Sequence, residues 1–208
     1  MRRISWIGLA GAIVFLVGYF LLAAVPGGGE VESADFEQFY VTDDRTGTAI
    51  VAMFLVTLGA LGLLWLLWEL RTRIGSPLSG LAFASGALGL ALVVGGAALL
   101  EAPSGAQAFG GAEFVGEPVA HAFAQAGWAA ILIGGALFLG LAIALFSAEG
   151  RRTGSLVGWV AIAGLVAAAL QLVAFIWVPS LAIPLWFILV AVTGIRGNTV
   201  GGETRAVT

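Results

Sequence analysis

The chain has 208 residues, of which 60% are hydrophobic and only 10% charged, with a formal net charge of −3 and a mean hydropathy of +1.05. Soluble domains average about half apolar and a quarter charged residues, so this composition excludes a water-soluble globular domain and a disordered chain. The sequence has no cysteine and a single histidine, which excludes a disulfide framework, a cysteine-ligated zinc site, a thiol nucleophile and a multi-histidine metal centre.

Six apolar stretches are long enough, or nearly long enough, to cross a bilayer, which requires about 20 residues of helix. In chain order they cover residues 4–25, 48–70, 78–100, 119–146, 155–178 and 181–195. The sixth stretch is short and carries Pro184 near its start, and the turn before it must be formed mostly by Pro179 and Ser180. These stretches predict an all-α polytopic membrane protein, with residues 1–208 as a single domain of three helical hairpins.

Two outer loops, residues 26–47 and 102–118, and a polar cytoplasmic tail, residues 197–208, complete the predicted layout. In the first loop, Phe36, Phe39 and Tyr40 have i, i+3, i+4 spacing. This spacing is typical of a short amphipathic helix, which would cover the bundle, whereas the alternative is a simple solvated loop. The first apolar stretch also follows Arg2 and Arg3 as a signal peptide would, but its length favours an uncleaved first span.

The arginines predict the orientation, because basic residues are concentrated in cytoplasmic loops. The chain has no lysine, and in the six-span layout only Arg45 lies on the outer side. The other eight lie together on the inner side: Arg2, Arg3, Arg71, Arg73, Arg151, Arg152, Arg196 and Arg205. We therefore expect both termini in the cytoplasm and the spans in the plasma (inner) membrane of a bacterium.

Two features of the spans bear on how the helices pack. Each odd-numbered span begins after arginines and ends at a proline, which fits either an internal repeat of one hairpin or the common chemistry of any hairpin of this orientation. Many of the 31 glycines lie within spans, and small residues let helix backbones approach closely in lipid. Such glycines pack helices of one chain or of two subunits, so a homo-oligomer or a membrane-protein partner stays open.

Few polar side chains are placed where they could bind or react. Glu117, His121 and Gln125 have i, i+4, i+8 spacing at the start of the fourth span, and Glu101 ends the third. Glu101, Glu117 and His121 are candidates for a weak metal or proton site, although a helix start in the headgroup zone explains the same pattern. Deeper in the spans, Gln171 is expected to form an interhelical hydrogen bond, and Trp128 and Trp186 to pack between helices.

Some local motifs resemble those of a known group of proteins. Gln38-Phe39-Tyr40 through Asp43-Asp44-Arg45, and the Trp-Glu-Leu-Arg ending at Arg71, resemble a broad group of small six-span bacterial membrane proteins from high-GC organisms. That group has a domain of unknown function. The resemblance covers mainly the first 75 residues, and it implies a fold and a location but no activity.

Three functional hypotheses follow. The first is a non-enzymatic structural or accessory six-helix bundle that binds membrane-protein partners, since no span carries a charge in its middle third. The second is a small transporter or channel for an uncharged or lipophilic molecule, with Gln125, Gln171, Trp128 and Trp186 as its polar intramembrane residues. The third is an outer-face sensor or cation site. We expect no catalytic residues, no cofactor, no resident metal and no nucleic-acid partner, with membrane lipids as the general surroundings.

Overall fold

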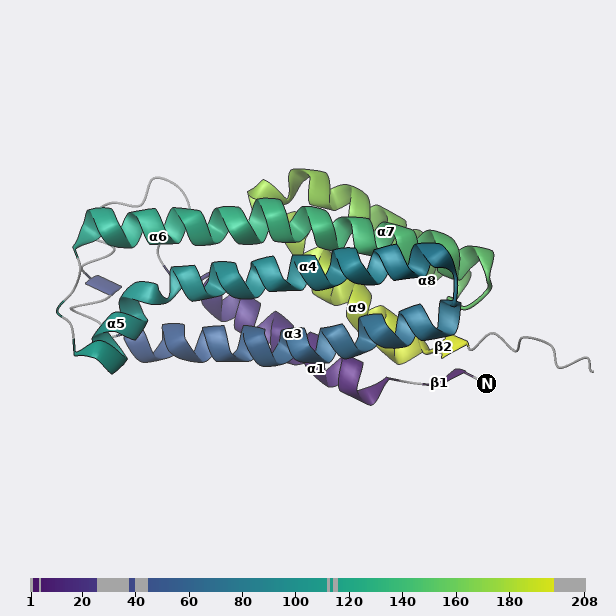
Figure 1. Cartoon of the computed structure of the whole chain (residues 1–208), viewed down its shortest axis with the longest axis horizontal. Coiled ribbons are helices and arrows are strands. Elements are labelled where there is room, and N and C mark those ends of the chain that lie inside the picture. The colour runs from purple at the N-terminus through teal and green to yellow at the C-terminus, as the bar shows by residue number, and fades with distance from the viewer. Residues whose placement is uncertain are drawn as a thin grey trace, which may run out of the picture.

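The computed structural model describes residues 2–3, 5–25, 38–39, 45–111, 113 and 116–196. Within these ranges the fold is all-α apart from two strands of two residues each, as Figure 1 shows. The expected amphipathic helix around Phe36 and Tyr40 and the tail from residue 197 lie outside the described residues, although Phe39 is described and is buried.

Four described helices are long and apolar enough to cross a membrane. They are α3 (Thr46–Ile74), α4 (Pro77–Leu100), the continuous helix Glu117–Arg152 and the helical stretch Gly158–Ile176. Two apolar helices are shorter: α1 (Trp6–Leu22) and the stretch Val178–Thr193, which includes α9 (Ala182–Thr193). All six regions predicted as spans are therefore helical.

Two of these helices depart from regular α geometry along their length. The helix Glu117–Arg152 consists of α6 (Glu117–Ala129), a π-helical section η2 (Ala130–Gly135) and α7 (Ala136–Arg152). The fifth predicted span begins with α8 (Gly158–Leu170) and tightens at its end into the 3₁₀ segment η3 (Gln171–Ile176), and a second 3₁₀ segment, η4 (Val178–Leu181), leads into α9. The connection 102–118, predicted as a loop, begins with the nine-residue helix α5 (Ala102–Gly110).

Local sequence explains where several helices begin and end. The Ser5 hydroxyl accepts a hydrogen bond from the Gly8 N–H and caps α1, and Ser76 does the same for α4 through the Ser79 N–H. Between α3 and α4, Gly75 has a φ of 65° and ends α3 in the left-handed conformation that glycine adopts without strain. The tight turn Gly75–Ser76 thus places α3 and α4 side by side.

The helices form a closed ring in chain order. α1 packs on α3, α3 on α4, α4 on α6 and α7, α7 on α8, α8 on α9, and α9 returns to α1. Figure 1 shows α3, α4 and the α6–α7 helix lying lengthwise beside one another, with the other helices behind them. In this arrangement the three predicted hairpins are α1 with α3, α4 with α6–α7, and α8 with α9.

Glycines bring the two helices of each of the first two hairpins close together. A Cβ added to Gly11 would lie 2.5 Å from the Gly62 Cα, and a Cβ on Gly96 would lie 2.6 Å from the Gly127 carbonyl oxygen. These contacts agree with the expectation of tight packing through small residues. By contrast, Gly95 and Gly158 have open space beside them, so not every glycine within a span lies at a helix contact.

The chain ends meet at one end of the bundle. Strand β1 (Arg2–Arg3) pairs antiparallel with β2 (Ile195–Arg196), and Arg73 donates from Nη1 to the Ile195 carbonyl oxygen at 2.8 Å. The helix α7 ends with Arg151 and Arg152, and Arg152 forms an ion pair with Glu149 at 2.7 Å. Figure 1 shows β1 and β2 together at the end opposite α5. The ends of α3 and α7, with Arg73, Arg151 and Arg152, therefore lie at the same end of the bundle as the two strands.

Candidate functional site

A lateral pocket of about 590 Å³ lies where the end of α1 meets the middle of the long helix and the unwound end of the fifth span. Its wall is formed by Ala23, Val25, Trp128, Leu132, Phe175, Ile176 and Trp177. Phe175 and Ile176 are 67% and 59% exposed, so the pocket opens sideways from the bundle. This volume falls within the range of about 300–1,000 Å³ that small-molecule sites usually occupy.

The unwound end of the fifth span builds one wall. Val173 has φ −118° and ψ 21°, outside helical geometry, and Trp177 has φ 68°, which makes it the one described non-glycine residue with positive φ. The cause in the sequence is Pro179, which has no N–H to continue the helix. A bulky residue at positive φ is strained, and such strain is often found at functional sites.

Gln171 braces this unwound segment. Its Nε2 donates to the Ala167 carbonyl oxygen at 2.8 Å and to the Pro179 carbonyl oxygen at 3.1 Å, so it joins α8 to the turn beyond η3. Gln171 is 2% exposed and packs against Gly140 of α7, where a Cβ would lie 2.9 Å from the Gln171 Cβ. The hydrogen bonds of Gln171 are therefore not the interhelical bond expected from the sequence: they run to its own helix and to the turn that leads toward α9, while its packing contact with Gly140 is interhelical.

Aromatic rings from α1 hold Trp177 in place. The Tyr19 ring stacks on Trp177 with centroids 5.9 Å apart, and Phe20 meets Trp177 edge-on at the same distance. The Tyr19 hydroxyl hydrogen-bonds the Ser180 hydroxyl at 2.7 Å, and Ser180 in turn donates to the Trp177 carbonyl oxygen. The strained residue is therefore fixed by α1 on one side and by its own turn on the other.

The opposite wall comes from the long helix, where Trp128 precedes the π-helical section and Leu132 lies inside it. π-helical sections are rare and occur often at functional sites. The indole Nε1 atoms of Trp128 and Trp177 are both buried and have no hydrogen-bond partner. None of the seven wall residues is charged, so the pocket offers an apolar surface with unpaired indole N–H groups near it and the backbone carbonyls at the ends of α1 and η3.

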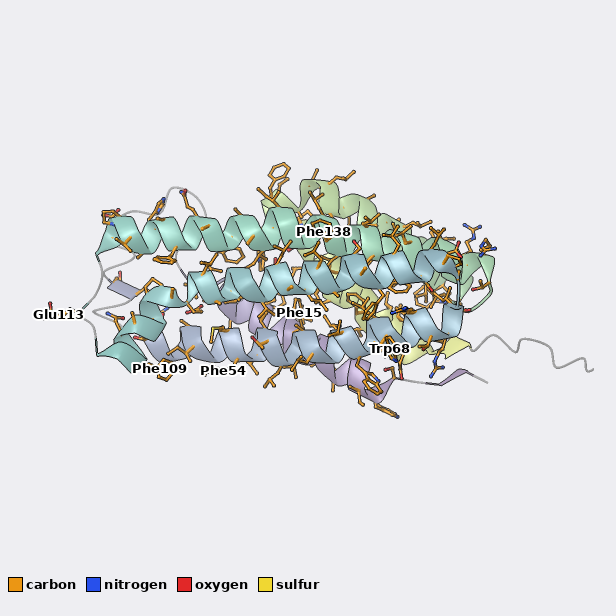
Figure 2. All side chains as sticks on the ribbon, viewed as in Figure 1. Phe15, Phe54, Trp68, Phe109, Glu113 and Phe138 are labelled. Atoms are coloured by element: carbon orange, nitrogen blue, oxygen red, sulfur yellow. The ribbon has the colours of Figure 1, made fainter. Side chains whose placement is uncertain are left out.

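The centre of the ring is filled. Phe15, Leu139 and Ile183 are among the residues that enclose a central cavity of only about 10 Å³, at the lower limit for a single water molecule. Phe15, labelled in Figure 2, is 2% exposed. At this level the cavity between the described helices holds no more than about one water molecule.

The residues predicted to form a polar intramembrane site lie apart. Trp128 lines the lateral pocket, whereas Gln171 lines a separate groove of about 340 Å³ between α7 and α8. Trp186 is 1% exposed and donates from Nε1 to the Val160 carbonyl oxygen at 3.1 Å, so it joins α9 to α8 as a packed side chain. Gln125 is exposed and lies one turn from His121, with 2.6 Å between its Nε2 and the His121 Nε2.

The predicted outer-face residues are also divided. His121 and Gln125 are in contact on α6, but no group of three or more His, Cys, Asp or Glu that could hold a metal ion occurs among the described residues. Glu101 instead lies at the elbow between α4 and α5, where it is 2% exposed. Burial raises the pKa of Glu101 to about 7, and the neighbouring Ser104 hydroxyl opposes part of this shift.

Sequence reasoning did not identify the main walls of the lateral pocket. The backbone conformation of Trp177 follows from the proline two residues later and from the rings of α1. Leu132 looked like any apolar span residue. The glycine pair Gly134-Gly135, which directly follows Ile133, is the one local signal in the sequence for irregular helix geometry here.

The fold and the pocket define the chain as an all-α protein with apolar helices of membrane-spanning length. Comparison with protein-family models, curated proteins and solved structures finds no match.

Proposed function

We propose that the chain is a six-span plasma-membrane protein, with both termini in the cytoplasm, that binds an uncharged lipophilic molecule in the lateral pocket. The observation that carries the proposal is the pocket itself: it has ligand size, no charge among its described wall residues, and a wall formed by two helices that leave α geometry at that point. The two shorter helices, α1 and the stretch Val178–Thr193, supply the first and sixth spans.

Helix lengths give the depth of the pocket in the bilayer. At 1.5 Å per residue, Leu132 lies about 30 Å along the helix from Arg152, and Ala23 lies about 25 Å from Trp6. Ile176 is about 30 Å from Gly158 when its 3₁₀ turns are included. Three separate elements therefore reach the pocket after about one hydrocarbon thickness, measured from their arginine-flanked ends. This depth corresponds to the outer boundary of the hydrocarbon core.

The chemistry of the wall limits the ligand. At that boundary a lipid-like molecule can enter sideways between Phe175 and Ile176, with its chain along the apolar wall. The polar groups nearby are neutral: indole N–H groups and the carbonyls of helix ends. A charged headgroup would be desolvated there without a counter-charge, which costs several kcal/mol. The favoured ligand has a long apolar body and a small uncharged head with hydroxyl groups, as a monoacylglycerol has.

A photolabelling experiment tests the proposal. The purified chain in lipid nanodiscs is irradiated with a diazirine-bearing monoacylglycerol, and the labelled residues are located by mass spectrometry. We expect labelling concentrated around Leu132 and Phe175–Trp177, and competition by unlabelled monoacylglycerol but not by the anionic fatty acid of the same chain length.

Two variants make the test specific. Leu132→Trp fills the pocket and is expected to lower the labelling of Phe175–Trp177 about tenfold. The ligand then buries less apolar surface, and the lost binding free energy is about that of burying one apolar side chain. Leu58→Trp places the same ring on an exposed part of α3, where Leu58 is 59% exposed, and should leave the labelling unchanged. Labelling spread evenly over the lipid-facing residues, or unaffected by Leu132→Trp, would show that the pocket holds only bulk lipid.

A further inference from the structure

The elbow between α4 and α5 gathers buried oxygen atoms, and it lies apart from the lateral pocket. Glu101 is both the residue that ends α4 and the residue that precedes α5, with φ −92° and ψ −1°. Ser104 and Gln107 follow at intervals of three residues on α5. Glu101 is 2% exposed, Ser104 is fully buried and Gln107 is half-buried.

The oxygen atoms of these side chains lack partners. Both carboxylate oxygens of Glu101, the Ser104 hydroxyl and the Gln107 side-chain carbonyl oxygen are buried without a partner at hydrogen-bond geometry, although the Ser104 hydroxyl lies near enough to Glu101 to oppose part of the rise in its pKa. Buried polar atoms in native proteins are nearly always paired, and an unpaired buried carboxylate is the costliest exception. An unpaired group of this kind requires an explanation such as an ion that completes the site.

No described group meets the geometry of a hydrogen bond to the Glu101 carboxylate. The described titratable groups on neighbouring segments are Arg45 before α3, Glu113, and Glu117 and His121 on α6. Glu113 is exposed and lies at the outermost tip of the end of the molecule that holds α5, as Figure 2 shows. The Glu101 side chain also leaves the N-terminus of α5 without a side-chain cap.

The donor atoms indicate the kind of ion. All four unpaired atoms are oxygens, which are the ligands of hard cations. Helical side chains lean toward the N-terminus of their helix, so Ser104 and Gln107 lean back toward Glu101. A single carboxylate balances one positive charge, whereas a divalent ion would leave an uncompensated charge in a buried site. We propose that Glu101, Ser104 and Gln107 bind one alkali cation, Na⁺ in the first instance, at the α4–α5 elbow.

Thermal unfolding of the full chain in detergent tests the proposal, with NaCl replaced stepwise by choline chloride at constant ionic strength and pH 8. We expect saturating Na⁺ to raise the melting temperature by roughly 5 °C, because a ligand that binds only the folded state stabilises it. Glu101→Gln, nearly the same in shape, should abolish this response. Glu117→Gln removes a carboxylate from α6 instead and should retain it.

A direct binding measurement keeps the test decisive if Glu101→Gln folds poorly. ²²Na⁺ binding to the wild-type chain is expected to saturate at one ion, and Ser104→Ala, which removes one oxygen, should weaken it roughly tenfold. Absence of saturable ²²Na⁺ binding would overturn the proposal. So would a melting temperature that responds to Ca²⁺ but not to Na⁺, or to pH alone, since the latter would mean that a proton neutralises Glu101.

Discussion

Gly96 illustrates how single residues set the distance between helices. A Cβ at position 96 would lie 2.6 Å from the Gly127 carbonyl oxygen and 2.7 Å from the Ile131 Cγ1, whereas Gly95, one residue earlier, has open space. In lipid, such close backbone approach takes the place of the hydrophobic force that drives packing in water. The two adjacent glycines therefore form a matched pair for mutation.

We expect Gly96→Ala to lower the free energy of unfolding by roughly 2 kcal/mol, because the methyl group forces α4 and α6 apart. Gly95→Ala should leave it unchanged or raise it by up to about 1 kcal/mol, since alanine favours the helix over glycine. Unfolding in dodecyl sulfate, followed by circular dichroism, measures both. Equal effects of the two substitutions would contradict this packing.

Glu101 makes the stability of the fold depend on pH. Its pKa of about 7 in the folded chain is above its ordinary value of 4.5, so the folded state binds more protons between these values. Stability should therefore be highest below pH 4.5 as far as this group is concerned, and should fall as the pH rises toward 7 and level off above it. The difference amounts to about 3 kcal/mol at most.

In sodium-free buffer, we expect the melting temperature of the wild type to fall by several degrees between pH 5 and pH 8, and that of Glu101→Gln to fall much less. Glu117→Gln removes a carboxylate from α6 instead, serves as the comparison and should keep the wild-type slope. Parallel curves for the wild type and Glu101→Gln would mean that Glu101 is not buried as described.

At this scale the sequence predicted residue types better than residue partners. Glu101 was recognised as a candidate ligand, but grouped with Glu117 and His121 because helix spacing was the only geometry available. Its association with Ser104 depends on the elbow that starts α5. This helix lies in the stretch 102–118, which the sequence predicts as a loop. Trp186 was correctly expected between helices. The hydrogen bond of Gln171 to Pro179 required knowledge of where α8 ends.

At the scale of whole elements, the stretch predicted as the fifth span leaves α geometry before its predicted end. An apolar run such as residues 155–178 is read from sequence as one regular helix, since Leu, Val and Ala give no stop signal. The tightening at Gln171–Ile176 results instead from Pro179, from Trp177 at positive φ and from the Gln171 side chain. The π-helical section Ala130–Gly135 is nearly as hard to predict, because the glycine pair Gly134-Gly135 is its one local signal and its other residues are ordinary span residues.

Gln171→Leu should loosen this element without unfolding the protein. The substitution removes the hydrogen bonds to the carbonyls of Ala167 and Pro179, but it also removes the buried and unpaired Gln171 Oε1. We therefore expect a change of less than about 1 kcal/mol in global stability, and amide exchange roughly tenfold faster at residues 173–180.

Hydrogen–deuterium exchange with mass spectrometry measures this, with the amides of Trp177 and Ser180 as the reporters, since both are hydrogen-bonded within the turn. Gln125→Leu, an exposed glutamine on α6, is the control and should leave the turn unchanged. Exchange that increases equally in α4 would mean that Gln171 supports the whole bundle and not this segment alone.

At the scale of the whole molecule, composition and arginine placement predicted an all-α chain with helices of membrane-spanning length, and the six apolar stretches are helical. The closed ring could not be predicted, because all six helices are apolar on most of their surface and their sequences carry little information on which faces meet. Nor could the pairing of β1 with β2, which joins the chain ends through only two residues each. The accessory, partner-binding role stays a prediction that copurification after mild solubilisation can check.

The proposed orientation has a clean test, because the chain has no cysteine and any introduced thiol is the only one present. Phe109 on α5 is 77% exposed, and Thr72, an exposed residue near Trp68, lies toward the other end of the molecule, as the labels Phe109 and Trp68 in Figure 2 indicate. With six spans and cytoplasmic termini, a membrane-impermeant maleimide should label Phe109→Cys in intact cells, and Thr72→Cys and Thr153→Cys only after permeabilisation.

Each outcome of this labelling separates one part of the proposal. The reverse pattern would place the arginines outside, against the preference of basic residues for the cytoplasmic side. Labelling of Thr72→Cys but not of Thr153→Cys in intact cells would mean that the second hairpin does not return to the same side, which removes the six-span layout. In either case the depth of the lateral pocket, counted from Arg152, would have to be counted from the opposite leaflet or abandoned.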